Sequence, residues 1–261
     1  MYHSITIGTK NTYTDWHLVP ETRPLVVLPT LKLVTVDVPG RDGILDLSDA
    51  IRHYPVYNNR VGSWRFHVLN DIANWVTIHE QIANYIHGRT FRVVLEDDPG
   101  FYYEGKLAFN SWTSNSDGTW SDVEIGYNLY PYKLSVAIST DEAWLWDPFS
   151  FVNGRIYGTG MKNIPVQSTS YVTKNLKGDI GHMPISPKFI VQSTAGIDLK
   201  FVNPELGLNV EHKNLTTGSY EFPEVIYTEF SENNIPTIQY KKSTSNNNTD
   251  LLSIQYRMGM L

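Results

Sequence analysis

His79-Glu80 is the best candidate for metal chemistry in this chain, because the pair lies in a stretch whose apolar residues repeat at helical spacing. A zinc protease that begins with this pair needs a second histidine four residues on, one turn along the same helix face. Ala83 occupies that position. We therefore expect no metal site here, and we predict that His79 is a hydrogen-bonded histidine of the core or of an interface.

A group of carboxylates early in the chain could serve a glycosidase or a calcium site. A glycosidase needs two carboxyl groups that face each other across a sugar, which a sequence cannot show. A calcium loop needs ligands at every second residue before a bidentate glutamate, and the spacing here does not match it. The glycines at 40 and 43 instead predict a solvated turn, followed by a short helical turn that starts at Asp46 or Ser48. The carboxylates are Asp37, Asp42, Asp46 and Asp49.

The remaining catalytic motifs are incomplete. Gly158-Thr159-Gly160 begins like a dinucleotide-binding loop, but Asn163 stands at the third glycine position and the surroundings are not strand, turn and helix. Ser63 and Ser219 both follow a glycine, yet neither lies in the G-x-S-x-G turn of a serine hydrolase. The chain has no cysteine, which excludes a thiolate nucleophile and a cysteine-liganded zinc. We expect no catalytic residue, no metal and no cofactor, and hence no enzyme.

Composition sets the outer limits. The chain has 261 residues, of which 41% are hydrophobic, enough for two cores of ordinary domain size. A net charge of −6 disfavours nucleic-acid binding. No stretch approaches the ~20 apolar residues of a membrane span, and the start of the chain lacks the basic and apolar pattern of an export signal. We expect two domains, no sequence-specific nucleic-acid contact and no membrane insertion.

The first half is predicted to be strand-rich with one strong helix. Asn70 or Asp71 can cap this helix, and Gly88 supplies a left-handed stop. Strands are expected at 91–96, 101–112 and 119–129, with turns at 97–100 and 115–118, which together form a meander beside the helix. The apolar stripe of the helix comprises Ile72, Trp75, Val76, Ile82, Ala83 and Ile86.

The second half reads as a β-sandwich. The regular alternation ends near residues 130–133, so we assign domains to residues 1–135 and 136–261. Short apolar–polar alternations then recur at 188–191, 197–201, 225–228 and 252–256. The polar tract 243–249, with its three consecutive asparagines, is expected to be an exposed loop.

Aromatic residues in or beside loops are the feature that would suit sugar binding. Tryptophan and tyrosine are also enriched in protein interfaces, where a rigid side chain buries a large area at little entropic cost. We favour the interface interpretation and keep sugar binding as the alternative. The residues are Trp112 and Trp120 in the first half, and Trp144, Trp146 and Tyr157, the candidate aromatic contact surface, in the second.

Several motifs occur together in an order that resembles the N-terminal domain of the distal tail protein (Dit) family of long-tailed phages. Over the second half the resemblance is looser, and residues 178–179 with 183–189, and residues 256–261, are similar to the short form of the family, which lacks an inserted carbohydrate module. The motifs of the first half are residues 8–16, 38–47, 57–60 with 64–68, 86–89, 95–99 with 103–105, and 130–133.

This resemblance implies a mainly β fold. The N-terminal domain would be a β-sandwich with one α-helix and an extended hairpin, and the C-terminal domain a galectin-like β-sandwich. It implies a hexameric ring in the virion, at the distal tip of the tail, built in the host cytoplasm. A ring of identical subunits needs a heterologous interface. The Gly-flanked turn is a candidate for that interface, with a solvated turn as the alternative, and comprises Pro39, Gly40, Arg41, Asp42 and Gly43.

The partners that the resemblance implies are all structural. They are further copies of the chain, in one ring or two stacked rings, the major tail tube protein, the tail-associated or tape-measure protein, and receptor-binding or baseplate proteins. The family offers no catalytic residue to transfer. The competing function is a lectin-like adsorption protein that recognises a glycan of the host wall, and a glycoside hydrolase ranks third.

Overall fold

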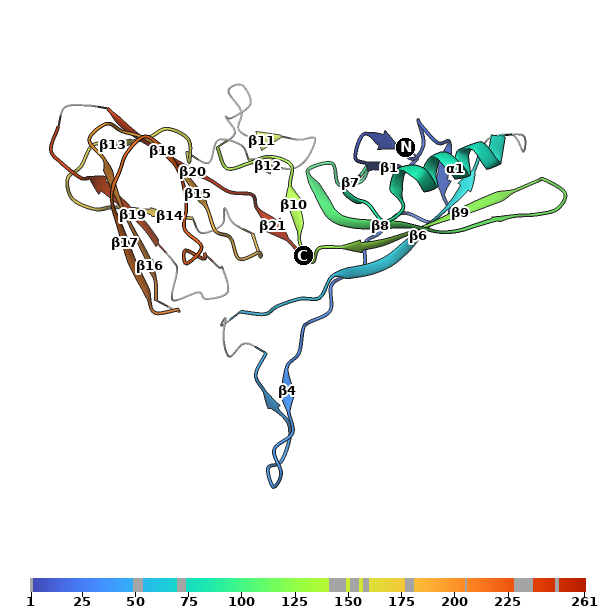
Figure 1. The fold of residues 1–261 in the computed structure, drawn as a ribbon, viewed down its shortest axis with the longest axis horizontal. Helices are drawn as coiled ribbons and strands as arrows, with labels where there is room; N and C mark the ends of the chain where they lie inside the picture. Colours follow the sequence, from blue (N-terminus) through green and yellow to red (C-terminus); the bar gives the residue numbers. More distant parts are fainter. Residues whose placement is uncertain are drawn as a thin grey trace. The chain divides into compact units, whose positions relative to one another are not determined.

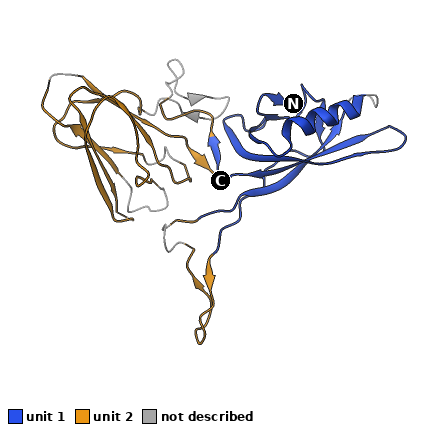
Figure 2. Ribbon diagram, viewed as in Figure 1, with its two compact units in different colours: residues 1–33, 56–134, 261 blue, residues 34–55, 135–260 orange. Residues whose placement is uncertain are grey.

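The computed structural model describes residues 2–48, 54–69, 74–140, 149–150, 155–156, 160–176, 181–204, 206–227, 237–246 and 249–261 (Figure 1). The chain is mainly β, as the sequence predicts. It divides into two compact units, which comprise residues 1–33, 56–134 and 261, and residues 34–55 and 135–260 (Figure 2). Within the described residues, no helix is long and apolar enough to cross a membrane.

The first unit is built on one antiparallel sheet. Its strands follow the order β2-β1-β7-β8-β9-β6-β3, and the meander expected from the sequence forms its β7-β8-β9 part. Long antiparallel ladders arise here because β-branched and aromatic residues alternate with polar ones between well-defined turns. The strands are β1 (Ile5–Ile7), β2 (Lys10–Asn11), β3 (Leu18–Pro20), β6 (Arg60–Val68), β7 (Thr90–Leu95), β8 (Phe101–Ser114) and β9 (Ser121–Leu129); β10 (Lys133–Ser135) follows β9 in the chain.

The helix α1 (Trp75–Ile86) packs one stripe into the core of this unit. Gly88 has a φ of +74° and ends the helix region as predicted. The predicted stripe was wrong at Val76, which is 67% exposed, and it missed Ile78, which is buried. The buried residues Trp75, Ile78, Ile82 and Ile86 are three or four apart, whereas Val76 is rotated by one residue away from their line. Ile72 of the predicted stripe and the candidate caps Asn70 and Asp71 lie outside the described residues.

The two faces of the sheet differ sharply. On the inner face, Trp64 and Phe66 of β6 pair with Ile125 and Val123 of β9, and all are buried in the same core as the helix stripe. The outer face carries charged pairs such as Arg65 with Glu124, 3.5 Å apart. One buried face and one solvated face are what an antiparallel sheet covered by a single helix requires.

The second unit contains a sandwich of two four-stranded antiparallel sheets, in the orders β13-β20-β15-β18 and β14-β19-β16-β17. Residues of both sheets share one core, in which the rings of Phe189 and Phe201 lie 5.1 Å apart. The strands of the sandwich are β13 (Ile164–Val166), β14 (Val172–Asn175), β15 (Lys188–Gln192), β16 (Ile197–Asn203), β17 (Leu208–Leu215), β18 (Gly218–Glu221), β19 (Thr237–Lys242) and β20 (Asp250–Gln255).

Five short strands of this unit lie outside the sandwich. They are β4 (Thr35–Val36), β5 (Leu45–Asp46), β11 (Phe149–Ser150), β12 (Arg155–Ile156) and β21 (Gly259–Met260). Strand β4 pairs with β5, β11 with β12, and β21 with β10.

One predicted strand of this unit was wrong. Residues 188–191, 197–201 and 252–255 lie in strands as expected, with Tyr256 just after β20, but 225–227 form no strand and Thr228 lies outside the described residues. Tyr227 makes only an isolated bridge to Ile185, and Val225 and Tyr227 are nevertheless buried. The apolar–polar alternation at 225–227 therefore reflects the burial of Val225 and Tyr227, and not the hydrogen bonding of a strand.

Candidate assembly surface

The hairpin β4–β5 has an apolar face that the described residues leave largely exposed. Thr35 pairs with Asp46 and Val36 with Leu45, and Leu47 donates its N–H to the carbonyl of Val34 at 2.8 Å. Because side chains alternate between faces, this register puts four apolar residues on one face and leaves Thr35, Asp37, Ile44 and Asp46 on the other. We call the first set the apolar hairpin face: Val34 (49% exposed), Val36 (43%), Leu45 and Leu47 (38%).

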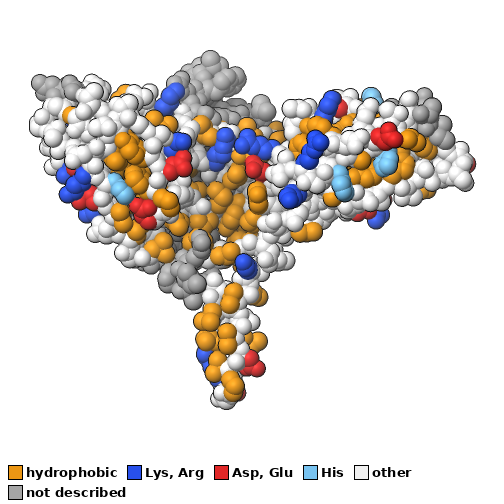
Figure 3. All heavy atoms as spheres, viewed as in Figure 1, with side chains coloured by type: hydrophobic (Ala, Val, Ile, Leu, Met, Phe, Trp, Pro, Cys, Tyr) orange, Lys and Arg blue, Asp and Glu red, His pale blue; other side chains and the backbone are white. Residues whose placement is uncertain are grey.

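Isolated two-stranded hairpins are at best marginally stable in water, and contiguous exposed apolar patches mark interaction sites. Figure 3 shows hydrophobic side chains gathered along the hairpin that Figure 1 labels β4. More than half of the exposed large hydrophobic residues of the described chain lie between residues 25 and 47. This stretch is therefore the strongest candidate for an assembly surface.

The predicted turn forms the tip of this hairpin. Gly40 and Gly43 have φ angles of +80° and +76°, and the N–H of Arg41 bonds to the carbonyl of Val38 at 3.1 Å. All five candidate interface residues from Pro39 to Gly43 are exposed and close together. Their role in a ring stays a prediction.

The expected helical turn does not start at Asp46, which belongs to strand β5; a turn that starts at Ser48 would lie in residues 49–53, outside the described residues. Ser48 bonds through its hydroxyl oxygen to the N–H of Val34, at 2.8 Å, and thereby helps to close the hairpin. A hydrogen bond from Ser48 to Asp46 lowers the pKa of that carboxyl below its ordinary value. Asp49 lies outside the described residues, and within them no cluster of three or more His, Asp or Glu side chains could hold a metal.

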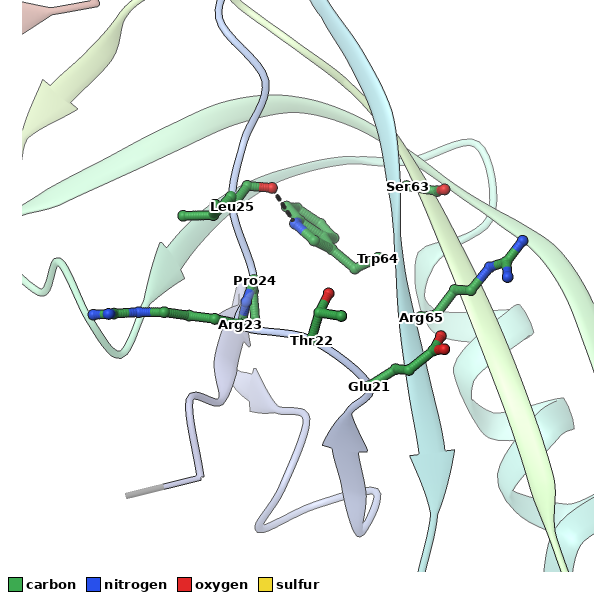
Figure 4. Close-up of a pocket in the computed structure, with 8 residues that line it drawn as sticks. All are labelled: Glu21, Thr22, Arg23, Pro24, Leu25, Ser63, Trp64 and Arg65. Atoms are coloured by element: carbon green, nitrogen blue, oxygen red, sulfur yellow. Dashed lines mark hydrogen bonds between the residues drawn. The ribbon is translucent and has the colours of Figure 1, made fainter.

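Three side chains of the first unit hold the segment that precedes the hairpin. The indole N–H of Trp64 donates to the carbonyl of Leu25 at 3.0 Å, which Figure 4 shows as a dashed line. The hydroxyl oxygen of Tyr127 accepts the N–H of Val27 at 3.2 Å, and Nη1 of Arg60 donates to the carbonyl of Val27 at 2.9 Å. The backbone at 25–27 is thus fixed by core side chains, although it belongs to no strand.

Arg60 is the most deeply buried of these anchors. The side chain is 1% exposed, its Nε donates to the carbonyl of Pro131 at 2.7 Å, and its guanidinium lies 5.4 Å from the centre of the Tyr103 ring. Burial lowers the pKa of Arg60 from its ordinary value. A buried guanidinium that donates to two carbonyl groups is a structural residue, because its removal takes a hydrogen bond from each of them.

Replacing Arg60 by methionine is expected to destabilise the first unit by an amount on the order of 2–4 kcal/mol, because the carbonyls of Val27 and Pro131 each lose a buried donor. Urea unfolding followed by tryptophan fluorescence measures this change. Arg65→Met is the matched control, because Arg65 lies on the same strand but is exposed, and its pair with Glu124 contributes ~1 kcal/mol or less. Equal effects of the two substitutions would contradict the assignment.

A shallow hollow lies beside the Trp64 anchor (Figure 4). Its volume is about 300 Å³, and Glu21 carries the single carboxylate among its described lining residues. A glycosidase needs two facing carboxyl groups, so this hollow has no such pair. The lining residues are Glu21, Thr22, Arg23, Pro24, Leu25, Ser63, Trp64 and Arg65.

The aromatic candidates fare differently. Trp144, Trp146 and Tyr157 lie outside the described residues. Trp112 is half-buried against the ring of His79, 5.1 Å away, and His79 also contacts Phe109 at 4.7 Å, so this histidine is held between aromatic rings at the edge of the core. Trp120 is exposed at the end of the β8–β9 hairpin.

Comparison with known proteins found a match by structure but none by sequence. No protein-family model matches the sequence, and no curated protein matches it. The structure is similar to that of the Dit protein (gp19.1) of phage SPP1, with a TM-score of 0.60 and 11% sequence identity over 100% of both chains. That protein is described as a paradigm of the hub adsorption apparatus in phages that infect Gram-positive bacteria. The chain therefore has a Dit-like fold over its whole length.

Proposed function

We propose that this chain is a structural subunit of the hub at the distal end of a phage tail, where it joins the tail tube to the tail-tip or baseplate proteins that contact the host. The observation that carries the proposal is the Dit-like fold, which extends over the full length of both chains. The uncovered apolar hairpin face supports it independently, because a subunit whose apolar surface is exposed when alone is suited to permanent assembly.

The assembly is proposed to be a homohexameric ring. In such a ring each subunit binds a different surface of the next copy through the same contact. The ring closes when the rotation between neighbours, repeated six times, makes a full turn. The hairpin supplies a distinct donor surface for this contact. The proposed further partners are the major tail tube protein on one side, and the tail-associated, tape-measure, receptor-binding or baseplate proteins on the other.

Mass photometry across a dilution series tests the proposal, together with negative-stain electron microscopy of the same sample. We expect particles of six subunits that image as rings. A monomer at every concentration up to tens of micromolar would count against a ring that forms from this chain alone.

The proposed role needs no catalysis and no cofactor. Glycan recognition by the second unit is the competing role, and that unit has a polar hollow of about 340 Å³ lined by Gln192, Ser193, Thr194, Thr217, Thr249 and Asp250. None of these described lining residues is aromatic, so none of them can stack on a sugar face. We expect native mass spectrometry with cell-wall fragments to show no binding tighter than roughly 100 µM, or about −5.5 kcal/mol. A tighter, selective glycan complex would favour the adsorption role instead.

Arg41→Glu is expected to leave the fold intact and to weaken the ring. Arg41 is exposed at the hairpin tip, so the substitution alters no buried contact of the monomer. A reversed charge at the rim of an interface typically changes association by a few-fold to about tenfold and makes it more dependent on salt. The dissociation midpoint of the assembly at two salt concentrations measures the effect, with Lys162→Glu in the second unit as a surface control.

A further inference from the structure

The segment through which the chain enters the second unit is bonded to the end of the chain. Residues 135–139 come directly after residue 134, where the chain passes from the first unit into the second. Apart from Ser135, the last residue of β10, they lie in no strand, and we call them the entry segment. Ser135 and Ser139 are polar, yet they are only 1% and 8% exposed. Buried polar groups of this kind need hydrogen-bond partners within the protein.

Ser139 finds these partners at the end of strand β20. Its hydroxyl donates to the carbonyl of Ile254 at 2.7 Å and accepts the N–H of Tyr256 at 2.8 Å. Its own N–H donates to the carbonyl of Tyr256 at 3.0 Å. One serine therefore ties the entry segment to the backbone of two residues near the end of the chain.

Arg257 and Met258 hold the other end of the entry segment. The N–H of Ser135 donates to the carbonyl of Met258 at 2.9 Å. Nη1 of Arg257 donates to the carbonyl of Ser135 at 2.8 Å and also to the carbonyl of Val136. The entry segment and residues 254–258 thus bond to each other at both ends of the segment.

Apolar burial adds little to this contact. Ile254 and Tyr256 belong to the core that the two sheets share, but no residue of 135–139 or 257–261 is part of the core that the described residues form. Segments with few buried apolar contacts open at a lower free energy than the core beside them. The order of the entry segment therefore depends mainly on its hydrogen bonds to residues 254–258.

We infer that the entry segment and the end of the chain form a latch, which opens and closes as one unit while the sandwich stays folded. When the latch is closed, residues 135–139 are a fixed part of the second unit. When it is open, they become a free tether, and residues 257–261 are released at the same time. The residues that bond through side chains are 115 to 122 positions apart in the chain, so the last residues of the chain control the order of the point of entry. All of these contacts lie within the second unit, so the latch does not depend on the proposed ring.

Hydrogen–deuterium exchange of the full-length protein, measured by mass spectrometry, tests the latch. Ser139→Ala removes the hydroxyl at one end, and Arg257→Met removes the guanidinium at the other. We expect each substitution to speed exchange by about tenfold or more in both 135–139 and 256–261, because opening at one end releases the other. Exchange in strands β15 and β16 should stay as in the parent.

Two further variants serve as controls. Ser139→Thr keeps a hydroxyl at the same position and should retain most of the protection. Lys213→Met removes an exposed cation of the same unit, which pairs only with Glu211 on its own strand among the described contacts, and should leave exchange at the latch unchanged.

Three results would overturn the latch. Faster exchange only beside the substituted side chain would show that the hydrogen bonds act separately. An equal rise in β15 and β16 would show that the entry segment unfolds only together with the sandwich. Unchanged exchange in both Ser139→Ala and Arg257→Met would show that these bonds do not hold the segment.

Discussion

Val36→Asp combined with Leu45→Asp is expected to yield a folded monomer in place of a ring. The two side chains pair across the hairpin on its apolar face, so the double substitution puts two carboxylates at the centre of the proposed contact. Loss of the burial of two apolar side chains alone corresponds to roughly 3–6 kcal/mol, or a hundredfold to ten-thousandfold in affinity. Mass photometry across dilution measures the change.

The opposite hairpin face provides the control for this experiment. Thr35→Asp with Ile44→Asp adds the same charge to the opposite face of the same hairpin, yet should change the dissociation midpoint little. Urea unfolding should be the same for both double variants, because these side chains contribute little to any core. If both variants dissociate equally, the hairpin acts through its overall charge or shape, and the apolar face has no special role.

Ile82→Asp is expected to unfold the first unit. Ile82 is fully buried among the helix stripe and the inner face of the sheet. A carboxylate there would be ionised without a partner or protonated at a cost of several kcal/mol, while the whole domain is stable by only about 5–15 kcal/mol. Circular dichroism and limited proteolysis should show loss of the folded unit, and assembly should disappear with it.

Val76→Asp is the matched control on the same helix. It adds the same group only six positions away, but Val76 is exposed to solvent, so the expected change is within about 0.5 kcal/mol. The two variants also distinguish between two orientations of the helix. In the structure Val76 faces solvent, whereas the sequence predicted that it belongs to the buried stripe. Strong destabilisation by Val76→Asp would favour the latter.

The helix and the meander could be predicted because local signals agree there. Gly88, the turns at 97–100 and 115–118, and the alternation between them each specify one conformation. The sequence wrongly placed Val76 on the buried face of the helix. An apolar residue next to a stripe is compatible with a stripe that is shifted by one residue, so helical spacing alone does not exclude it. Only the position of the sheet decides which side is buried.

The hairpin could have been found from the sequence. Val34, Val36 and Val38 alternate with polar residues before the turn, as do Leu45 and Leu47 after it, which is the pattern of paired strands. The glycines at 40 and 43 predicted the turn between these strands, but the strands themselves were not predicted. The structural role of Arg60 could not be predicted from the sequence. Its side chain is buried with carbonyl acceptors that lie 33 and 71 residues away in the chain, and no local sequence pattern indicates such contacts.

The hairpin's apolar face would also determine how the proposed ring responds to temperature and salt. Association through apolar burial is driven by the release of hydration water, so it weakens on cooling and is little affected by the screening that weakens surface ion pairs. The proposed contact between subunits would therefore persist at both low and high salt concentration. Cold rather than salt would be the condition that loosens it.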